Sequence, residues 1–237
     1  MPDKIIADLK KELAKYADRK YRVNAAQFDK DKTERWVLRA PIVRAVSKEK
    51  FRELKALPKR QILDLCDRIL ESDLEARRFF AFDWADKLER QYEKTDFSRF
   101  ERWLKAYVEN WGHCDHLGTG PMGKLVYRFP GLIPKVMKWT RSKNMWLRRA
   151  SAVTLIVPVR HRQNLDDVFK TADILLEDSE DLVQKGYGWM LKVAGDRFPD
   201  EVFAYVLANK SRMPRTALRY AIEKFPQSRR KQAMARD

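Results

Sequence analysis

The chain has 237 residues, with 50 Lys and Arg against 34 Asp and Glu, a formal net charge of +16 and a pI of about 9.8. The length allows a single domain with a sizeable core, and the charge indicates a polyanionic partner, with nucleic acid as the first candidate. No apolar run approaches the roughly 20 residues of a membrane span, and the N-terminal segment lacks the apolar core of a signal peptide. We therefore expect a cytoplasmic protein that does not bind membranes.

The elements predicted along the chain are all helices. An apolar stripe at helical spacing opens the sequence, at Ile5, Ile6, Leu9, Leu13 and Tyr16. A second stripe follows at Phe97, Phe100, Leu104 and Val108. Prolines at 41, 58, 130, 199 and 214 fall at the expected helix ends. The fold class predicted is all-α, with about a dozen short helices.

The arrangement expected for these helices is an α-α superhelix, a solenoid of HEAT-like antiparallel helix pairs with a basic concave cleft. Short amphipathic helices that cannot bury a face alone suggest stacking, and HEAT repeats run about 40 residues. Trp111 or Asp115, then Arg148 and Arg149, then Trp189 recur at about that spacing. A globular bundle is the alternative. We predict one repeat domain, 1–226, and a flexible basic tail, 227–237.

The positive charge is concentrated in one long stretch without carboxylates. Between His116 and Leu165 there is no Asp or Glu, whereas ten Lys and Arg occur. A solvated surface normally mixes both signs, so this stretch is better explained as a phosphate-binding face.

The segment NWGHCDHLGTGPMG, Asn110 to Gly123, allows three interpretations. GTGPMG fits the dinucleotide-binding pattern, but that pattern needs a preceding strand, and here a helix precedes it and Pro121 interrupts it. A turn between helices is the preferred interpretation of these glycines.

The second interpretation is a metal site. His113 and His116 would share a helix face, with Cys114 or Asp115 nearby. The remaining ligands are missing, because the one other histidine, His161, lies in a basic segment. Cys66 and Cys114 form no C-x-x-C pair, so neither a disulfide framework nor a zinc ribbon is indicated. We expect no metal and no cofactor.

The third interpretation pairs Trp111 with Asp115, one helical turn apart and so on one face. Taken alone, a Trp in an amphipathic helix is more often a core residue than a functional one.

Several segments in order resemble the AlkD family of DNA alkylation repair glycosylases, which are built of HEAT-like repeats. They are RVNAAQFDKDKTERWVLRAPIVR, FERWLKAYVENWGHCDHL, SKNMWLRRASAVTLIVPVR, and DLVQKGYGWMLKVAGDRFPDEVFAYV with the MPRTALRYAIEKF that follows it. Together they cover most of Tyr21 to Phe225. Gly112, His113 and Cys114, between Trp111 and Asp115 in FERWLKAYVENWGHCDHL, and the glycine-rich GTGPMG after them depart from the family pattern.

The resemblance implies that Trp111, Asp115, Arg149 and Trp189 line the lesion site. Asp115 would stabilise positive charge on the deoxyribose and supply water, the two tryptophans would flank the sugar, and Arg149 would grip a phosphate and lower the pKa of Asp115. The expected substrate is duplex DNA carrying cationic N3- or N7-alkylated purines, excised without deep base flipping by a monomer that needs no protein partner. Further phosphate contacts are expected from Arg148, Lys143, Arg160, Arg162, Lys124, Lys185 and Arg215.

Two other functions fit the same composition. One is a non-catalytic DNA-binding solenoid that recognises branched or distorted DNA. The other is a protein-interaction scaffold, which would show little salt-dependent affinity for DNA.

Overall fold

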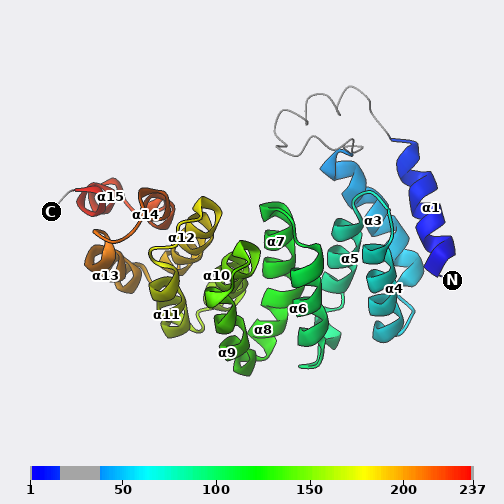
Figure 1. The fold of residues 1–237 in the computed structure, drawn as a ribbon, viewed down its shortest axis with the longest axis horizontal. Helices are drawn as coiled ribbons and strands as arrows, with labels where there is room; N and C mark the ends of the chain where they lie inside the picture. The colour runs from blue at the N-terminus through cyan, green and yellow to red at the C-terminus, as the bar shows by residue number, and fades with distance from the viewer. Residues whose placement is uncertain (1, 17–37, 236–237) are drawn as a thin grey trace. The chain divides into compact units, whose positions relative to one another are not determined.

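A computed structural model describes residues 2–16 and 38–235, and every regular element in these ranges is a helix (Figure 1). The all-α prediction is therefore confirmed. The chain divides into two compact units, Met1–Gln91 and Tyr92–Asp237, where the sequence predicts one domain. Most of the first segment that carries the family resemblance, residues 22–37, lies outside the described ranges. None of the described helices is both long and apolar enough to cross a membrane.

The N-terminal unit contains α1 (Pro2–Ala14), α3 (Ala40–Leu54), α4 (Lys59–Glu71), α5 (Arg77–Asp86) and the short 3₁₀ helix η1 (Glu89–Gln91). Its core includes the fully buried Trp84, whose indole Nε1 donates to the hydroxyl of Ser47 at 2.9 Å. That hydroxyl in turn donates to Asp83 at 2.5 Å, so α3 and α5 are joined by a satisfied polar chain as well as by apolar contact. The Cys66 thiol is fully buried on α4.

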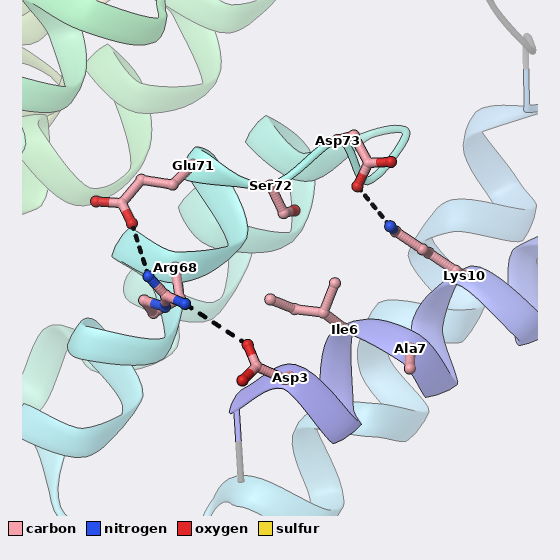
Figure 2. A pocket seen from close by; sticks show the side chains of 8 residues that line it. All are labelled: Asp3, Ile6, Ala7, Lys10, Arg68, Glu71, Ser72 and Asp73. Carbon is pink, nitrogen blue, oxygen red and sulfur yellow. Dashed lines mark hydrogen bonds and ion pairs between the residues drawn. The ribbon is translucent and has the colours of Figure 1, made fainter.

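Helix α1 packs through the predicted stripe, although the stripe is narrower than the sequence suggests. Ile6, Leu9 and Leu13 are buried, whereas Tyr16 is 43% exposed. Figure 2 shows Ile6 pointing toward α4, with ion pairs on either side from Asp3 to Arg68 (3.6 Å) and from Lys10 to Asp73 (2.5 Å). Exposed pairs of this kind contribute little to stability, so the apolar stripe holds α1 in place.

The C-terminal unit contains the remaining helices. They are α6 (Asp96–Tyr107), α7 (Trp111–Leu117), η2 (Gly118–Met122), α8 (Gly123–Arg128), η3 (Pro130–Leu132), α9 (Ile133–Met137), η4 (Lys138–Arg141), α10 (Met145–Arg160), α11 (Leu165–Leu175), α12 (Asp181–Gly195), α13 (Pro199–Asn209), α14 (Arg215–Ile222) and α15 (Gln227–Met234). Within this unit α10, α12 and α14 lie side by side, while α11 and α13 form a second row (Figure 1). Short connections between successive helices make neighbours antiparallel, as expected for stacked helix pairs.

Close helix packing explains the glycines of GTGPMG. A Cβ on Gly118 would lie 2.9 Å from Val153 Cγ1, and a Cβ on Gly123 would lie 2.7 Å from Val157 Cγ2, both on α10. The segment is a π-helical turn, η2, bent at Gly120, that carries α7 into α8. Gly120 has non-helical φ/ψ (−93°, −114°), so the chain kinks there between α7 and α8, where the sequence predicts a turn between helices.

The predicted flexible tail is helical from Gln227 to Met234, which form α15. Ala233 is buried. The Arg229 guanidinium bonds Asp200 at 2.6 Å and lies 5.0 Å from the ring centroid of Phe203. These contacts fix α15 against α13 and explain why the basic composition did not keep the segment unfolded.

Candidate active site

The start of α7 places Trp111 and Asp115. Asn110 is extended, and its side-chain oxygen accepts a hydrogen bond from the backbone N–H of His113 at 2.9 Å, which caps the helix. Helical geometry from this cap puts Trp111 and Asp115 one turn apart on the same face, as predicted. The Asp115 carbonyl also accepts from the Thr119 hydroxyl at 2.7 Å, so the carboxylate-bearing turn is tied to the π-helical segment.

Arg149 holds the Asp115 carboxylate with both arms of its guanidinium. Nε donates to Oδ1 at 2.9 Å and Nη2 donates to Oδ2 at 2.8 Å, a bidentate pair between α10 and α7. Nη1 donates to the carbonyl of Leu182 on α12. Gly186 leaves room for the arginine stem, since a Cβ there would lie 3.1 Å from Arg149 Cγ.

Arg149 therefore positions Asp115. The residue is only 5% exposed and its guanidinium is committed to Asp115 and Leu182. The predicted phosphate contact of Arg149 stays a prediction, and the sequence does not reveal that this side chain points into the helix layer.

Burial raises the pKa of Asp115 above that of an ordinary aspartate, and the hydrogen bonds and charge of Arg149 oppose this increase without cancelling it. Arg149 does act to lower the pKa of Asp115, as predicted. Desolvation is the larger effect, so the net pKa is raised. The carboxylate side chain remains 19% exposed, so a ligand can approach it.

A cavity of about 370 Å³ opens in front of this pair. Its lining residues come from α7, α10, α12 and α14, and are Trp111, Asp115, Arg149, Leu182, Lys185, Trp189, Lys192 and Tyr220. All four residues expected at the lesion site are thus brought together. Trp111 is 60% exposed, an unusual position for an indole that packing alone would bury.

Sequence reasoning missed Leu182, Lys192 and Tyr220. Lys185, Trp189 and Lys192 follow one another at helical spacing and so share the cavity face of α12 with Leu182. Its helical spacing from Lys185 and Trp189 could have placed Lys192 at the site from the sequence alone. Tyr220 comes from α14 and had no such signal, because only the packing of α14 against α12 brings it to the cavity.

The two lysines of the cavity are ion-paired at its rim. Lys185 pairs with Asp181 at 2.6 Å, which raises the pKa of this lysine. Lys192 pairs with Glu223 at 3.0 Å, and its ammonium lies 5.5 Å from the ring centroid of Tyr220. The cavity therefore presents one carboxylate among three cationic side chains.

The other residues expected to bind phosphate do not line the cavity. Arg148 is turned toward Asp178, with Nε to Oδ2 at 2.6 Å, and Nη1 donates to the carbonyl of Ser142 at 2.9 Å. The remaining candidates are half-buried in the case of Lys124 and exposed in the cases of Lys143, Arg160, Arg162 and Arg215. Their roles stay predictions, and Arg148 is placed as a link between α10 and the turn before α12.

Cys114 and His113, beside Asp115, contact neighbouring groups of the protein. Cys114 is fully buried, its thiol donates to the carbonyl of Trp146 at 3.6 Å, and burial raises the pKa of the thiol. His113 Nε2 lies 3.3 Å from the side-chain nitrogen of Asn110. Within residues 2–16 and 38–235, no group of three potential metal ligands occurs.

Stacked helix pairs with a carboxylate held in a cation-lined cavity define the class, a helical-repeat protein with an organised polar site. The sequence profile described as "DNA alkylation repair enzyme" matches residues 9–225, so the chain belongs to the DNA alkylation repair enzyme family and has a role in alkylation repair. Among the curated proteins, no sequence matches.

Two solved structures share the fold. One is titled a predicted DNA alkylation repair enzyme from Enterococcus faecalis, with a TM-score of 0.77 and 16% identity over 89% of this chain and 97% of that one. The other is AlkD2 from Streptococcus mutans, with a TM-score of 0.58 and 17% identity over 89% of this chain and 100% of that one. These similarities confirm the predicted AlkD-like helical repeat fold.

Proposed function

We propose that this protein is a DNA glycosylase that excises cationic N3- and N7-alkylated purines from duplex DNA. The observation that supports this most directly is the Asp115 carboxylate, fixed by Arg149 and facing a cavity that Trp111 and Trp189 also line. Family membership supports DNA as the partner.

The chemistry suits a single carboxylate. An alkylated purine already carries positive charge, so the base can leave without a strong general acid, and positive charge then builds on the deoxyribose. At about 4 Å and an effective dielectric near 20, a carboxylate attracts a unit cation by roughly 4 kcal/mol. Only the part of this attraction that grows toward the transition state accelerates the reaction. Asp115 also carries a lone pair that can orient the attacking water.

The tryptophans complete the proposed site. Their π faces would attract the developing sugar cation by about 0.5 to 2 kcal/mol each and limit access of bulk water. Trp111 is 60% exposed, which suits contact with the backbone of a duplex lying on the surface. We therefore retain the expectation that the base leaves without rotation into a deep pocket.

The test is base release from duplex DNA containing 7-methylguanine, measured by chromatography, with duplex affinity measured in parallel. We expect release by the wild-type protein and loss of release in Asp115→Asn, because a neutral amide cannot stabilise the sugar cation. Duplex affinity should persist in that variant. Uracil, a neutral base without charge-assisted departure, serves as the control substrate and should leave much more slowly than 7-methylguanine.

Two outcomes would overturn this proposal. Duplex binding by the wild-type protein without base release would favour the non-catalytic DNA-binding function. Equal release of uracil and 7-methylguanine would remove charge-assisted departure as the mechanism.

A further inference from the structure

A second concave feature lies beside the candidate active site, between α14 and α15. This groove has a volume of about 560 Å³. The described residues that line it are Arg219, Tyr220, Ile222, Glu223, Gln227, Arg230, Lys231 and Met234. We refer to it as the α14–α15 groove.

The charges of this groove are suited to an anion. Arg219, Arg230 and Lys231 are exposed, and within the described part of the chain no ion pair neutralises them. Glu223 is the acidic member of the described lining, and Lys192 already neutralises it at 3.0 Å. A polyanion would therefore gain attraction without first displacing an internal partner.

The basic residues of α15 lie on two different faces of the helix. Gln227, Arg230, Lys231 and Met234 follow helical spacing and point to the groove, whereas Arg229 points to Asp200 and the ring of Phe203. Arg229 fixes the helix, and its neighbours Arg230 and Lys231 remain available for a ligand.

The groove adjoins the candidate active site. Tyr220 lines both cavities, and Glu223 of the groove is bonded to Lys192 of the site. A ligand that extends from Asp115 past Tyr220 thus meets Arg219, Arg230 and Lys231 next.

We infer that the α14–α15 groove binds backbone phosphates of the duplex on one side of the lesion. This inference rests on the proposed function for the position of the lesion, but duplex binding tests it without any excision. The occupant expected is the sugar-phosphate backbone, because a row of exposed cations next to apolar Tyr220 and Met234 matches alternating phosphates and deoxyriboses.

The experiment compares two double variants with equal net charge. The groove variant is Arg230→Gln with Lys231→Gln. The control is Arg212→Gln with Lys224→Gln, whose cations are also exposed but pair with Glu177 at 2.7 Å and Asp196 at 2.5 Å. Affinity for an undamaged duplex is measured by fluorescence anisotropy over a range of salt concentrations.

We expect the slope of log affinity against log salt to become shallower by about 1.8 in the groove variant, at roughly 0.9 per phosphate contact, and to change little in the control. At about 0.1 M salt this corresponds to a roughly ten- to hundredfold loss of affinity. Arg219→Gln, on α14, should reduce the slope by about 0.9. Because this residue lies outside α15, the result does not depend on whether α15 stays folded. Equal slopes for the groove variant and the control would overturn the inference.

Base release separates this inference from the proposed function. If the wild-type protein releases no alkylated base and the groove variant still has the shallower slope, the glycosylase proposal fails and the groove assignment stands. If base is released and the groove variant binds duplex as the control does, the groove assignment fails alone. Loss of affinity for anionic lipid vesicles, with duplex affinity unchanged, would also overturn it.

Discussion

Asp115 is the residue on which the proposed chemistry depends, and its environment sets the pH range of activity. Burial raises the pKa of Asp115. As the pH is lowered, the excision rate should therefore begin to fall at a pH above the usual pKa of an aspartate. Arg149→Gln removes the contribution that lowers this pKa. The acid limb should then move to a still higher pH, because the carboxyl group stays protonated longer. Single-turnover excision rates measured across pH in both proteins test this.

The sign of that shift is informative. If Arg149 acted only as a scaffold, its replacement would reduce the rate equally at all pH values and leave the limb in place. Arg149→Gln should also lower the free energy of unfolding by about 3 to 5 kcal/mol, since it breaks a buried pair. Excision is therefore measured at a temperature where circular dichroism shows the variant to be folded.

Replacement of Trp111 should affect excision without affecting the free energy of unfolding. Its indole is 60% exposed, so Trp111→Ala should change the free energy of unfolding by no more than about 0.5 kcal/mol. Excision should fall by about two- to thirtyfold, the range that corresponds to one cation–π contact. The fully buried Trp103 is the contrast, since Trp103→Ala should cost about 3 to 5 kcal/mol of stability. A large loss of stability in Trp111→Ala would mean that this indole is a packing residue.

Much of the candidate site could be predicted at the level of residues. Trp111 and Asp115 share a helical turn, and the family resemblance adds Arg149 and Trp189. The direction of Arg149 could not be predicted, because it depends on the open space beside Gly186 on another helix. Tyr220 was missed for a similar reason, since it reaches the cavity only through packing of α14 against α12.

At the scale of elements, the π-helical turn η2 makes the close contact of α7 and α8 with α10. A Cβ on Gly123 would lie 2.5 Å from the carbonyl oxygen of Gly118, a distance that requires the backbone to shift. Gly123→Ala should therefore lower the free energy of unfolding by about 1 to 3 kcal/mol. Gly131→Ala is the matched control, because a Cβ there meets nothing within 4 Å. Urea denaturation of both variants measures the difference, and equal stabilities would contradict the packing explanation.

The local sequence predicted a break at GTGPMG but not its form. Glycine and proline lower helix propensity, and this property alone favours a turn. The chain does kink at Gly120, and the flanking Gly118 and Gly123 pack closely against Val153 and Val157. Such a contact involves residues about 35 positions apart and leaves no local pattern. In contrast, the periodic stripes of α1 and α6 predicted those helices well.

At the scale of the whole molecule, the net charge of +16 favours binding to duplex DNA, but not every cation is available. Lys143 is exposed, whereas Arg148 is bonded to Asp178 at 2.6 Å. Lys143→Gln should therefore reduce the slope of log affinity against log salt by about 0.9, while Arg148→Gln should mainly reduce stability. Anisotropy titrations and thermal unfolding of the two variants distinguish these effects. A shallower slope in Arg148→Gln alone would reverse the assignment.

The fold class was predictable because helical periodicity runs through the chain, and no sequence segment favours strands. The division into two compact units after Gln91 was not predictable. Amphipathic helices on both sides of that point have the same pattern, and a boundary between units depends on which faces pack together rather than on composition.

The burial of both thiols has a practical meaning for a protein of an alkylation repair family. Such electrophiles react with thiolates, and Cys66 and Cys114, the only cysteines in the sequence, are fully enclosed, with the acidity of Cys114 further suppressed. We expect iodoacetamide to label neither cysteine in the native protein and both in urea, as mass spectrometry would show. Thiol alkylation would then require unfolding, so the folded chain keeps both cysteines out of reach of alkylating reagents.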